Sequence, residues 1–269
     1  DPIFFPKDGF LNLRRAILPP TQTTLRQPLK PSSTDVVVLC GGLGTRLGHL
    51  TANTPKPLLP IDVSPFLLRL LLRLQEEGFS RFILAAHYLP DPFRKFLKIH
   101  QRYLPGAKLI LEPQRLGTGG GLRYAIEQVS SDTFLALNGD SWVQQPLQPV
   151  LEEHERLDRE FTVVAVRASH VQGQVLKKGV WQLGLDGEIK GFETQDAVKE
   201  GWVNAGCYLM SRAMVASWPV GSYSLEANLP LLFKGWRAGV YCSEGRLLDI
   251  GTPDNYERAS VILGSMVLS

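Results

Sequence analysis

The chain has 269 residues, of which 44% are hydrophobic and 20% charged, with a formal net charge of +3. This composition is typical of a globular protein with a substantial core, and the scattered Lys and Arg residues argue against a nucleic-acid partner. The three cysteines, Cys40, Cys207 and Cys242, form no CxxC pair. This spacing argues against a zinc site and favours a reducing compartment such as the cytoplasm. No apolar run approaches the roughly 20 residues that span a bilayer, so we expect no membrane partner.

Residues 1–33 differ from the rest of the chain. They contain six prolines and show little hydrophobic periodicity. We predict a proline-rich N-terminal arm or linker over residues 1–33, followed by one domain over residues 34–269.

From Thr34 onward, strand signals alternate with helical signals. The predicted strands are 35–40, 81–86, 108–112 and 133–138, and the predicted helices are about 65–78, 91–103 and 118–129. This order indicates βαβ units. We therefore predict an α/β, Rossmann-like fold with a mixed, mostly parallel sheet flanked by helices.

After about residue 160 the pattern changes to α+β, which adds a second part, 161–269, to the first part, 34–160. The expected elements are a strand at 161–166, a hairpin at 181–192 around Asp186-Gly187, a strand at 203–209, a helix after Ser224, an extended stretch at 239–249 and a helix from Pro253. Near the end of the first part, the charged run 152–156 predicts a solvated helix face.

The run Val36-Val37-Val38-Leu39 leads directly into the glycines of residues 41–44. Glycine lets bare backbone N–H groups approach a ligand, because it has no Cβ and tolerates positive φ. Arg46 and, ten positions later, Lys56 place cations on either side of the loop. Together they point to a nucleotide polyphosphate, and the alternative is a plain glycine turn with two surface cations.

The loop matches neither of two common phosphate motifs. In the dinucleotide pattern G-x-G-x-x-G, the last glycine would stand where this chain has Leu47. A P-loop requires Lys-Ser or Lys-Thr after the final glycine, and neither occurs here.

A second glycine cluster, Gly117-Thr118-Gly119-Gly120-Gly121, opens a predicted helix. Inside a helix each glycine costs about 1 kcal/mol relative to alanine. Close approach of a base or a sugar would explain the cluster, and a flexible helix entry is the alternative.

Two aspartates are candidates for a metal site. Asp140 follows the strand that ends at Asn138, and ligands gather at such strand ends in open α/β sheets. Asp249 lies between an apolar strand and the start of a helix. Mg²⁺ binds through one or two carboxylates plus phosphates. Either residue alone could instead be an N-cap or turn residue.

These motifs together resemble the sugar-1-phosphate nucleotidylyltransferases. Gly42 to Leu47 and Pro55-Lys56-Pro57 reproduce the family's G-x-G-T-R-L and P-K-P motifs. Further motifs in family order are Leu-Gly-Thr-Gly-Gly at 116–120, Asn-Gly-Asp at 138–140, Val-Asn-Ala-Gly at 203–206, Ser-Leu-Glu at 224–226 and Asp-Ile-Gly-Thr-Pro at 249–253. The set is most similar to the D-glycero-D-manno-heptose 1-phosphate guanylyltransferase branch, with mannose-1-phosphate guanylyltransferases as near neighbours.

The resemblance implies the nucleotide-diphospho-sugar transferase fold and Mg²⁺-dependent transfer from a nucleoside triphosphate, with GTP favoured, to heptose or mannose 1-phosphate. It assigns catalysis to Arg46, Lys56 and Asp140, and Mg²⁺ to Asp140 and Asp249. It assigns nucleotide binding to Leu39, Gly41, Gly42, Gly44, Thr45, Glu112, Gly117 and Thr118. It assigns sugar binding to Glu193, Asn204 and Glu226.

One departure from the family pattern concerns the residues that would bind the sugar phosphate. Many members have a Glu-Lys pair after the hairpin, whereas here Glu193 is followed by Gln195 in place of the lysine. Two alternatives therefore remain. One is transfer of another nucleotide or to glucose 1-phosphate, and the other is a non-catalytic regulatory paralogue that binds a nucleotide-sugar. A homo-oligomer is left open.

Overall fold

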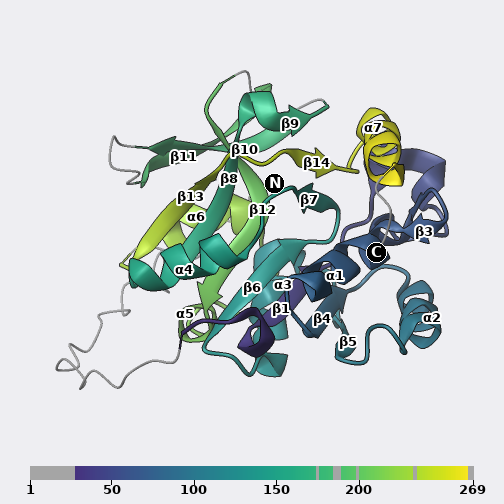
Figure 1. Cartoon of the computed structure of the whole chain (residues 1–269), viewed down its shortest axis with the longest axis horizontal. Helices are drawn as coiled ribbons and strands as arrows, with labels where there is room; N and C mark the ends of the chain where they lie inside the picture. Colours follow the sequence, from purple (N-terminus) through teal and green to yellow (C-terminus); the bar gives the residue numbers. More distant parts are fainter. Residues whose placement is uncertain (1–27, 174–175, 184–188, 198–199, 233–234, 266–269) are drawn as a thin grey trace.

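A computed structural model describes residues 28–173, 176–183, 189–197, 200–232 and 235–265 (Figure 1). A nine-stranded sheet forms its centre, in the order β11-β10-β12-β6-β1-β4-β5, with β8 between β12 and β13. Its strands are β1 (Asp35–Leu39), β4 (Arg81–Ala86), β5 (Ala107–Leu111), β6 (Thr133–Asn138), β8 (Phe161–Arg167), β10 (Leu176–Leu183), β11 (Ile189–Ala197), β12 (Trp202–Ser211) and β13 (Ala238–Ser243).

The predicted α/β fold with a mostly parallel first half is confirmed. β1 pairs in parallel with both β4 and β6, and β4 pairs in parallel with β5. β12 then runs antiparallel to β6 and to β8, and so begins the mixed second half. Because the parallel strands share one direction, the loops that follow β1, β5 and β6 emerge at the same edge of the sheet.

Helices cover both faces of this sheet. They are α1 (Phe66–Glu76), α2 (Pro90–His100), α3 (Gly117–Ala125), α4 (Gln148–Arg156), α5 (Arg212–Ala216), α6 (Leu225–Leu232) and α7 (Pro253–Gly264). Side chains of α1, α2, α4 and α7 form one buried cluster, and those of α3, α5 and α6 form the other. Along β1, Val36 and Val38 join the first cluster and Val37 the second, which is the alternation of a strand buried on both sides.

The predicted hairpin of the second half is present as β10 and β11, in which Trp181 pairs with Phe192. The expected turn at Asp186-Gly187 lies outside the described residues. The expected solvated face at 152–156 is wrong for His154. This side chain is 3% exposed, its Nδ1 lies 2.8 Å from the Thr162 Oγ1, and burial lowers its pKa to about 4.

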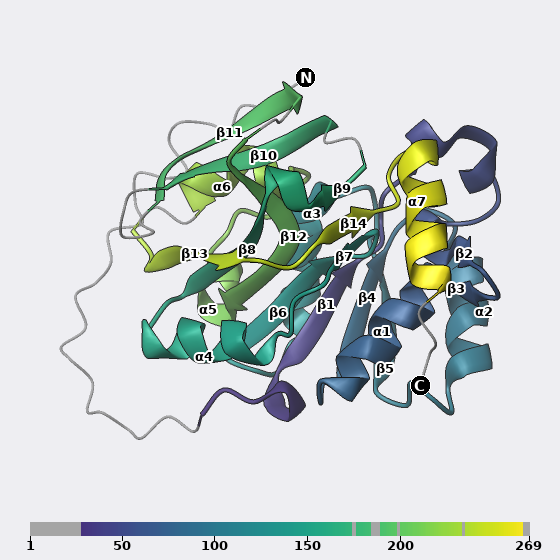
Figure 2. The same cartoon turned by 45° about the horizontal axis from the view of Figure 1, so that its top comes forward.

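Two small sheets were not predicted. β2 (Pro60–Ile61) pairs with β3 (Ser64–Pro65), and β14 (Leu247–Asp249) lies between β7 (Ser141–Val143) and β9 (Val171–Gln172). Figure 2 shows β14 leading from β13 along β7 and β9 toward α7. The second of these sheets joins the two halves of the domain close to Asp140.

Most of the predicted N-terminal arm lies outside the described residues, which begin at Pro28. The part that is described contacts the domain. The Leu29 N–H lies 3.3 Å from the Glu155 carboxylate, and Pro31–Ser33 forms a 3-10 turn whose Ser33 carbonyl accepts a hydrogen bond from Arg81. The boundary between arm and domain stays a prediction.

Among the described helices, none has the length and apolar character needed to cross a membrane. All three cysteines lie in the described residues and are unpaired, with Cys40 and Cys207 buried and Cys242 exposed.

Candidate functional site

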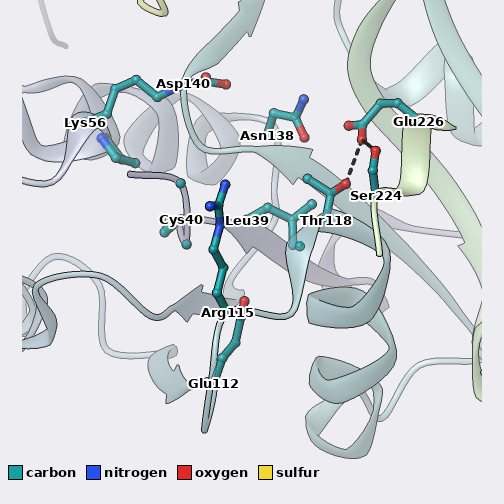
Figure 3. A pocket seen from close by; sticks show the side chains of 14 residues that line it. Leu39, Cys40, Lys56, Glu112, Arg115, Thr118, Asn138, Asp140, Ser224 and Glu226 are labelled. Carbon is teal, nitrogen blue, oxygen red and sulfur yellow. Dashed lines mark hydrogen bonds and ion pairs between the residues drawn. The ribbon is translucent and has the colours of Figure 1, made fainter. Parts of the chain in front are cut away.

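The loops after β1, β5 and β6 surround a cavity of about 310 Å³, called the main pocket here (Figure 3). It is lined by Leu39, Cys40, Gly41, Gly42, Lys56, Pro57, Glu112, Arg115, Gly117, Thr118, Asn138, Asp140, Ser224 and Glu226. Nine of the residues predicted for the site are in this lining, from segments up to 187 positions apart (226 − 39). The fold therefore brings the glycine loop, the Lys56 motif and the Asp140 motif to one place.

The glycine loop is anchored at both ends. The Cys40 N–H donates to the Ala85 carbonyl at 2.7 Å, which continues the β1–β4 ladder by one residue. Gly44 then takes a positive φ of 68°, and its carbonyl accepts the Thr51 hydroxyl at 3.0 Å. Between these anchors, Gly41 and Gly42 line the main pocket, and a Cβ added to Gly42 would meet nothing within 4 Å. The loop leaves open space for a ligand on this side.

Lys56 and Asp140 form an ion pair in the main pocket, and both are largely buried. Asp140 also accepts a hydrogen bond from the Ser141 hydroxyl at 3.1 Å. Gly139 allows this approach, since a Cβ there would lie 2.8 Å from the Leu39 carbonyl oxygen and 3.3 Å from Pro57. The Asn-Gly-Asp and Pro-Lys-Pro motifs are thus parts of one packed unit.

The unpredicted sheet places Asp249 beside Asp140. Asp249 pairs with Ser141 across the β14–β7 ladder, and the next residue, Ile250, donates its N–H to the Asp140 carbonyl at 3.0 Å. The Asp249 carboxylate is buried, and its Oδ1 accepts the Gly251 N–H at 2.9 Å and the Asn255 amide at 3.0 Å. These two hydrogen bonds fix the orientation of the carboxylate.

A smaller cavity of about 180 Å³ adjoins the main pocket and is called the side pocket here. It is lined by Leu43, Gly44, Thr45, Arg46, Lys56, Arg115 and Gly251. A Cβ on Gly251 would lie 3.1 Å from the Asp249 Oδ1 and 3.2 Å from an Arg46 guanidinium nitrogen. Arg46 and Asp249 therefore approach the same point, and Lys56 borders both cavities.

Glu112 lies at the base of the main pocket, where it is 7% exposed. Burial raises the pKa of its carboxyl, while a hydrogen bond from the Leu116 N–H at 3.0 Å and the nearby His87 act to lower that pKa. A Cβ on Gly41 would lie 3.2 Å from the Glu112 Oε1, and one on Gly121 would lie 2.8 Å from it. Both glycine clusters leave room for this carboxylate.

The glycines that open α3 are required by packing within the chain, more than by a ligand. A Cβ on Gly119 would lie 2.3 Å from the Tyr223 ring, and one on Gly120 would lie 2.0 Å from the Gly221 carbonyl oxygen. The Gly119 N–H donates to the Tyr223 carbonyl at 3.0 Å. The expectation that a base or sugar explains these two glycines is therefore wrong.

This packing predicts that Gly120→Ala destabilises the protein. The new methyl group must displace backbone on the 221–223 loop, because no side chain there can move aside. We expect the free energy of unfolding to fall by about 3 kcal/mol, which lowers the Tm by roughly 6–12 °C for a chain of this size. Thermal denaturation would measure the change. Gly42→Ala, whose Cβ meets nothing, is the matched control, and an equal loss in both variants would contradict the packing argument.

Thr118 and Glu226 belong to one hydrogen-bond network at the pocket wall. The Glu226 carboxylate accepts the Thr118 hydroxyl at 2.6 Å and the Ser224 hydroxyl at 2.9 Å (Figure 3). Behind it, burial and the Glu226 charge raise the pKa of the Tyr208 phenol, which accepts a hydrogen bond from the Asn204 amide at 2.8 Å. Asn204 is buried and is not part of the lining of the main pocket.

Glu193 lies apart from these residues, exposed on β11. The ladder of the hairpin sets Lys178 of β10 directly opposite Gln195. A lysine therefore stands across from the position where the family's lysine is missing.

Five lining residues were missed by the sequence analysis as site residues: Cys40, Pro57, Arg115, Asn138 and Ser224. Pro57, Asn138 and Ser224 fall inside motifs that had been noted, and their positions were the available signal. The Asn138 Oδ1 is buried and has no hydrogen-bond partner among the described residues. Burial, with the nearby carboxylates, raises the pKa of the Cys40 thiol, so this thiol stays protonated.

The described part of the chain contains no group of three or more His, Cys, Asp or Glu side chains that could hold a metal by themselves. Asp249 on β14 pairs with Ser141, the residue after Asp140, so the two aspartates offer carboxylate oxygen donors from adjacent segments. Mg²⁺ is commonly held by one or two carboxylates, several waters and substrate phosphates. The donor set therefore fits Mg²⁺ bound together with a nucleotide and fits no closed protein cage.

The fold and these two cavities define an α/β protein with pockets at its strand ends, one of them lined by Arg46, Lys56 and Arg115. The sequence profile described as "Nucleotidyl transferase" matches residues 35–265, and the chain belongs to this family. This confirms the family predicted from the motifs.

Relatives of two kinds support the resemblance. Mannose-1-phosphate guanylyltransferase of Mycobacterium tuberculosis is 31% identical over 235 residues, which are 85% of this chain and 64% of that protein. D-glycero-alpha-D-manno-heptose 1-phosphate guanylyltransferase of Campylobacter jejuni is 27% identical over 223 residues, which are 82% of this chain and 96% of that protein. This chain thus spans less than two thirds of the first relative and nearly all of the second.

Solved structures agree. HddC from Yersinia pseudotuberculosis, also solved in complex with GMP-PN, superposes with a TM-score of 0.75 at 27% identity over 86% of this chain and 99% of its own. A putative glucose-1-phosphate thymidylyltransferase from Bacillus anthracis gives a TM-score of 0.76 at 18% identity, over 87% of this chain and 96% of its own. The second likeness shows the fold alone.

Proposed function

We propose that this protein transfers a guanylyl group from GTP to the 1-phosphate of mannose or a manno-configured heptose, and releases pyrophosphate. One observation carries the proposal: the Lys56–Asp140 pair stands where the two cavities meet, and Asp249 pairs with Ser141, the residue after Asp140. The names of the guanylyltransferase relatives support the choice of base and sugar.

The two cavities suit the two parts of the reaction. The side pocket, which carries Arg46 and Lys56, suits the β- and γ-phosphates. We assign the main pocket, which Glu112 and Glu226 line together with Lys56 and Asp140, to the base, the α-phosphate and the acceptor sugar. In this arrangement the α-phosphorus lies near Lys56 and Asp140.

In the proposed reaction, an oxygen of the sugar phosphate attacks the α-phosphorus. A new P–O bond forms, the bond to the oxygen that bridges to the β-phosphate breaks, and pyrophosphate leaves with that electron pair. The attacking oxygen is already anionic, so no general base is required. Lys56 stabilises the charge that develops on the α-phosphate, and Arg46 stabilises the departing pyrophosphate. Positioning of the two anions supplies the rest of the rate enhancement.

We propose that Asp140 and Asp249 hold Mg²⁺, because the carboxylate oxygens of these two aspartates are donors that suit this ion. When bound, Mg²⁺ neutralises phosphate charge and orients the phosphate oxygens. Lys56 remains beside Asp140 and keeps a positive charge next to the reacting phosphate.

We propose that Glu112 reads guanine. The Watson–Crick edge of guanine offers the N1–H and N2–H donors, and a buried carboxylate supplies matching acceptors. On the acceptor side, Glu226 and the unpartnered Asn138 Oδ1 suit sugar hydroxyls, and Glu193 and Asn204 remain proposed sugar-site residues.

A matrix of nucleoside triphosphates and sugar 1-phosphates tests the function directly. With Mg²⁺, purified protein should release pyrophosphate fastest with GTP and mannose or heptose 1-phosphate, and EDTA should stop the release. Preference for UTP or dTTP with glucose 1-phosphate would favour the alternative transferase. Binding of a nucleotide-sugar without pyrophosphate release from any pair would favour the regulatory paralogue.

The unpaired cysteines support a reducing compartment, and we propose the cytoplasm.

A further inference from the structure

Arg115 belongs to neither the glycine loop nor the Pro-Lys-Pro motif, yet it lines the site. It lies on the loop between β5 and α3, and with Lys56 it is one of two residues that line both the main pocket and the side pocket. Figure 3 shows its side chain extending from this loop up into the main pocket, toward the end of β1 at Cys40. The guanidinium therefore stands at the boundary between the two cavities.

The charge of the side pocket points to an anion. Arg46, Lys56 and Arg115 contribute three positive charges to a cavity of about 180 Å³ whose lining contains no Asp or Glu. Among the described residues, no carboxylate forms an ion pair with Arg115, whereas Lys56 is paired with Asp140. Like charges that line one small cavity repel each other, and a bound polyanion offsets that repulsion.

The backbone of Arg115 is fixed although its side chain is exposed. Its carbonyl accepts the Ser222 hydroxyl at 2.9 Å. The next residue, Leu116, donates its N–H to Glu112 at 3.0 Å and accepts the Tyr223 N–H at 2.9 Å. The guanidinium thus extends from an anchored base, and its planar group of donors can bind two phosphate oxygens at once.

We propose that Arg115 is a third phosphate-binding cation, which contacts the β- and γ-phosphates of the triphosphate and the pyrophosphate that leaves. This inference rests on the proposed function, because it assigns the side pocket to the triphosphate end of the nucleotide. It separates the roles of the cations. Lys56 serves the α-phosphate beside Asp140, and Arg115 acts with Arg46 only on the phosphates that are lost.

Calorimetric titration of GTP, GMP and inorganic pyrophosphate, each with Mg²⁺, into the wild-type protein and its variants tests this role without turnover. Arg115→Ala should weaken the binding of GTP and pyrophosphate about 10- to 100-fold, as expected for loss of a charge-assisted contact. GMP lacks the β- and γ-phosphates, so its affinity should stay within about twofold of the wild-type value. Arg115→Lys should recover part of the loss, because it keeps the charge but not the planar donor group.

Arg102→Ala is the matched control, since it removes one exposed arginine from the turn after α2. It should bind all three compounds like the wild-type protein. If Arg115→Ala binds GTP as tightly as the wild type, or loses GMP and GTP affinity equally, the role of Arg115 is wrong while the proposed function stands. If the wild-type protein binds neither GTP nor pyrophosphate, the proposed function itself fails, and this inference fails with it.

Discussion

Replacing Asp140 with asparagine should lower kcat by about 1000-fold while leaving the fold intact. Asparagine keeps the shape of the side chain and its hydrogen bond from Ser141, but it removes the charge that pairs with Lys56 and that we assign to Mg²⁺. We expect the loss to fall on the reacting α-phosphate, where we propose that both Lys56 and Mg²⁺ act. Steady-state pyrophosphate release over a range of Mg²⁺ concentrations measures the effect, and thermal denaturation checks the fold.

Asp91→Asn is the matched control for this change. Asp91 is an exposed acid at the start of α2 that pairs with Arg94, so the substitution also removes one carboxylate from an ion pair with a basic side chain. It should leave turnover within about twofold of the wild type. Turnover of Asp140→Asn close to that of Asp91→Asn would remove Asp140 from the reacting centre.

The parts of the site that lie next to a strand end could be predicted from sequence. Hydrophobic runs such as 36–39 and 134–137 identify buried parallel strands, and parallel strands deliver their following loops to one edge of the sheet. The glycine loop and Asp140 follow from this rule, because each comes within a few residues of its strand. Local spacing was enough for them.

Other parts depend on contacts between distant segments. Asp249 reaches Asp140 through a three-stranded sheet whose members are two or three residues long, too short for a periodic signal. In the sequence Arg115 is a single arginine far from Arg46 and Lys56, and only the fold brings the three residues to one cavity. The glycines at 119 and 120 were assigned to a ligand because the loop at 221–223 that packs on them is about 100 residues away.

The same limit applies to charge patterns. A charged run predicts a solvated helix face, and five residues cannot reveal which of them faces the sheet. In α4 it is His154, which lies beside Thr162 of β8. Burial lowers the pKa of this imidazole and keeps it neutral. Only the tertiary structure shows that this residue is buried.

The second large effect is expected on the preference for the nucleotide base, and the Glu112→Gln variant tests it. A glutamine amide presents one acceptor and one donor group, so it turns a donor toward one of the two guanine donors. We expect kcat/KM with GTP to fall about 10- to 100-fold, the range for losing a good bidentate base contact. With UTP, whose N3–H and carbonyl oxygens suit an amide, kcat/KM should stay unchanged or rise.

The pKa of Glu112 gives an independent readout of the same role. Burial raises this pKa, so the carboxyl takes up a proton at a higher pH than an ordinary glutamate does. Below that pKa the protonated group loses acceptor capacity, so the preference for GTP over UTP should fall as the pH is lowered. Glu112→Gln should abolish this pH dependence, and Glu127→Gln, an exposed glutamate just after α3, should retain it. An equal loss of GTP and UTP activity in Glu112→Gln would instead mean that Glu112 only holds the Leu116 backbone in place.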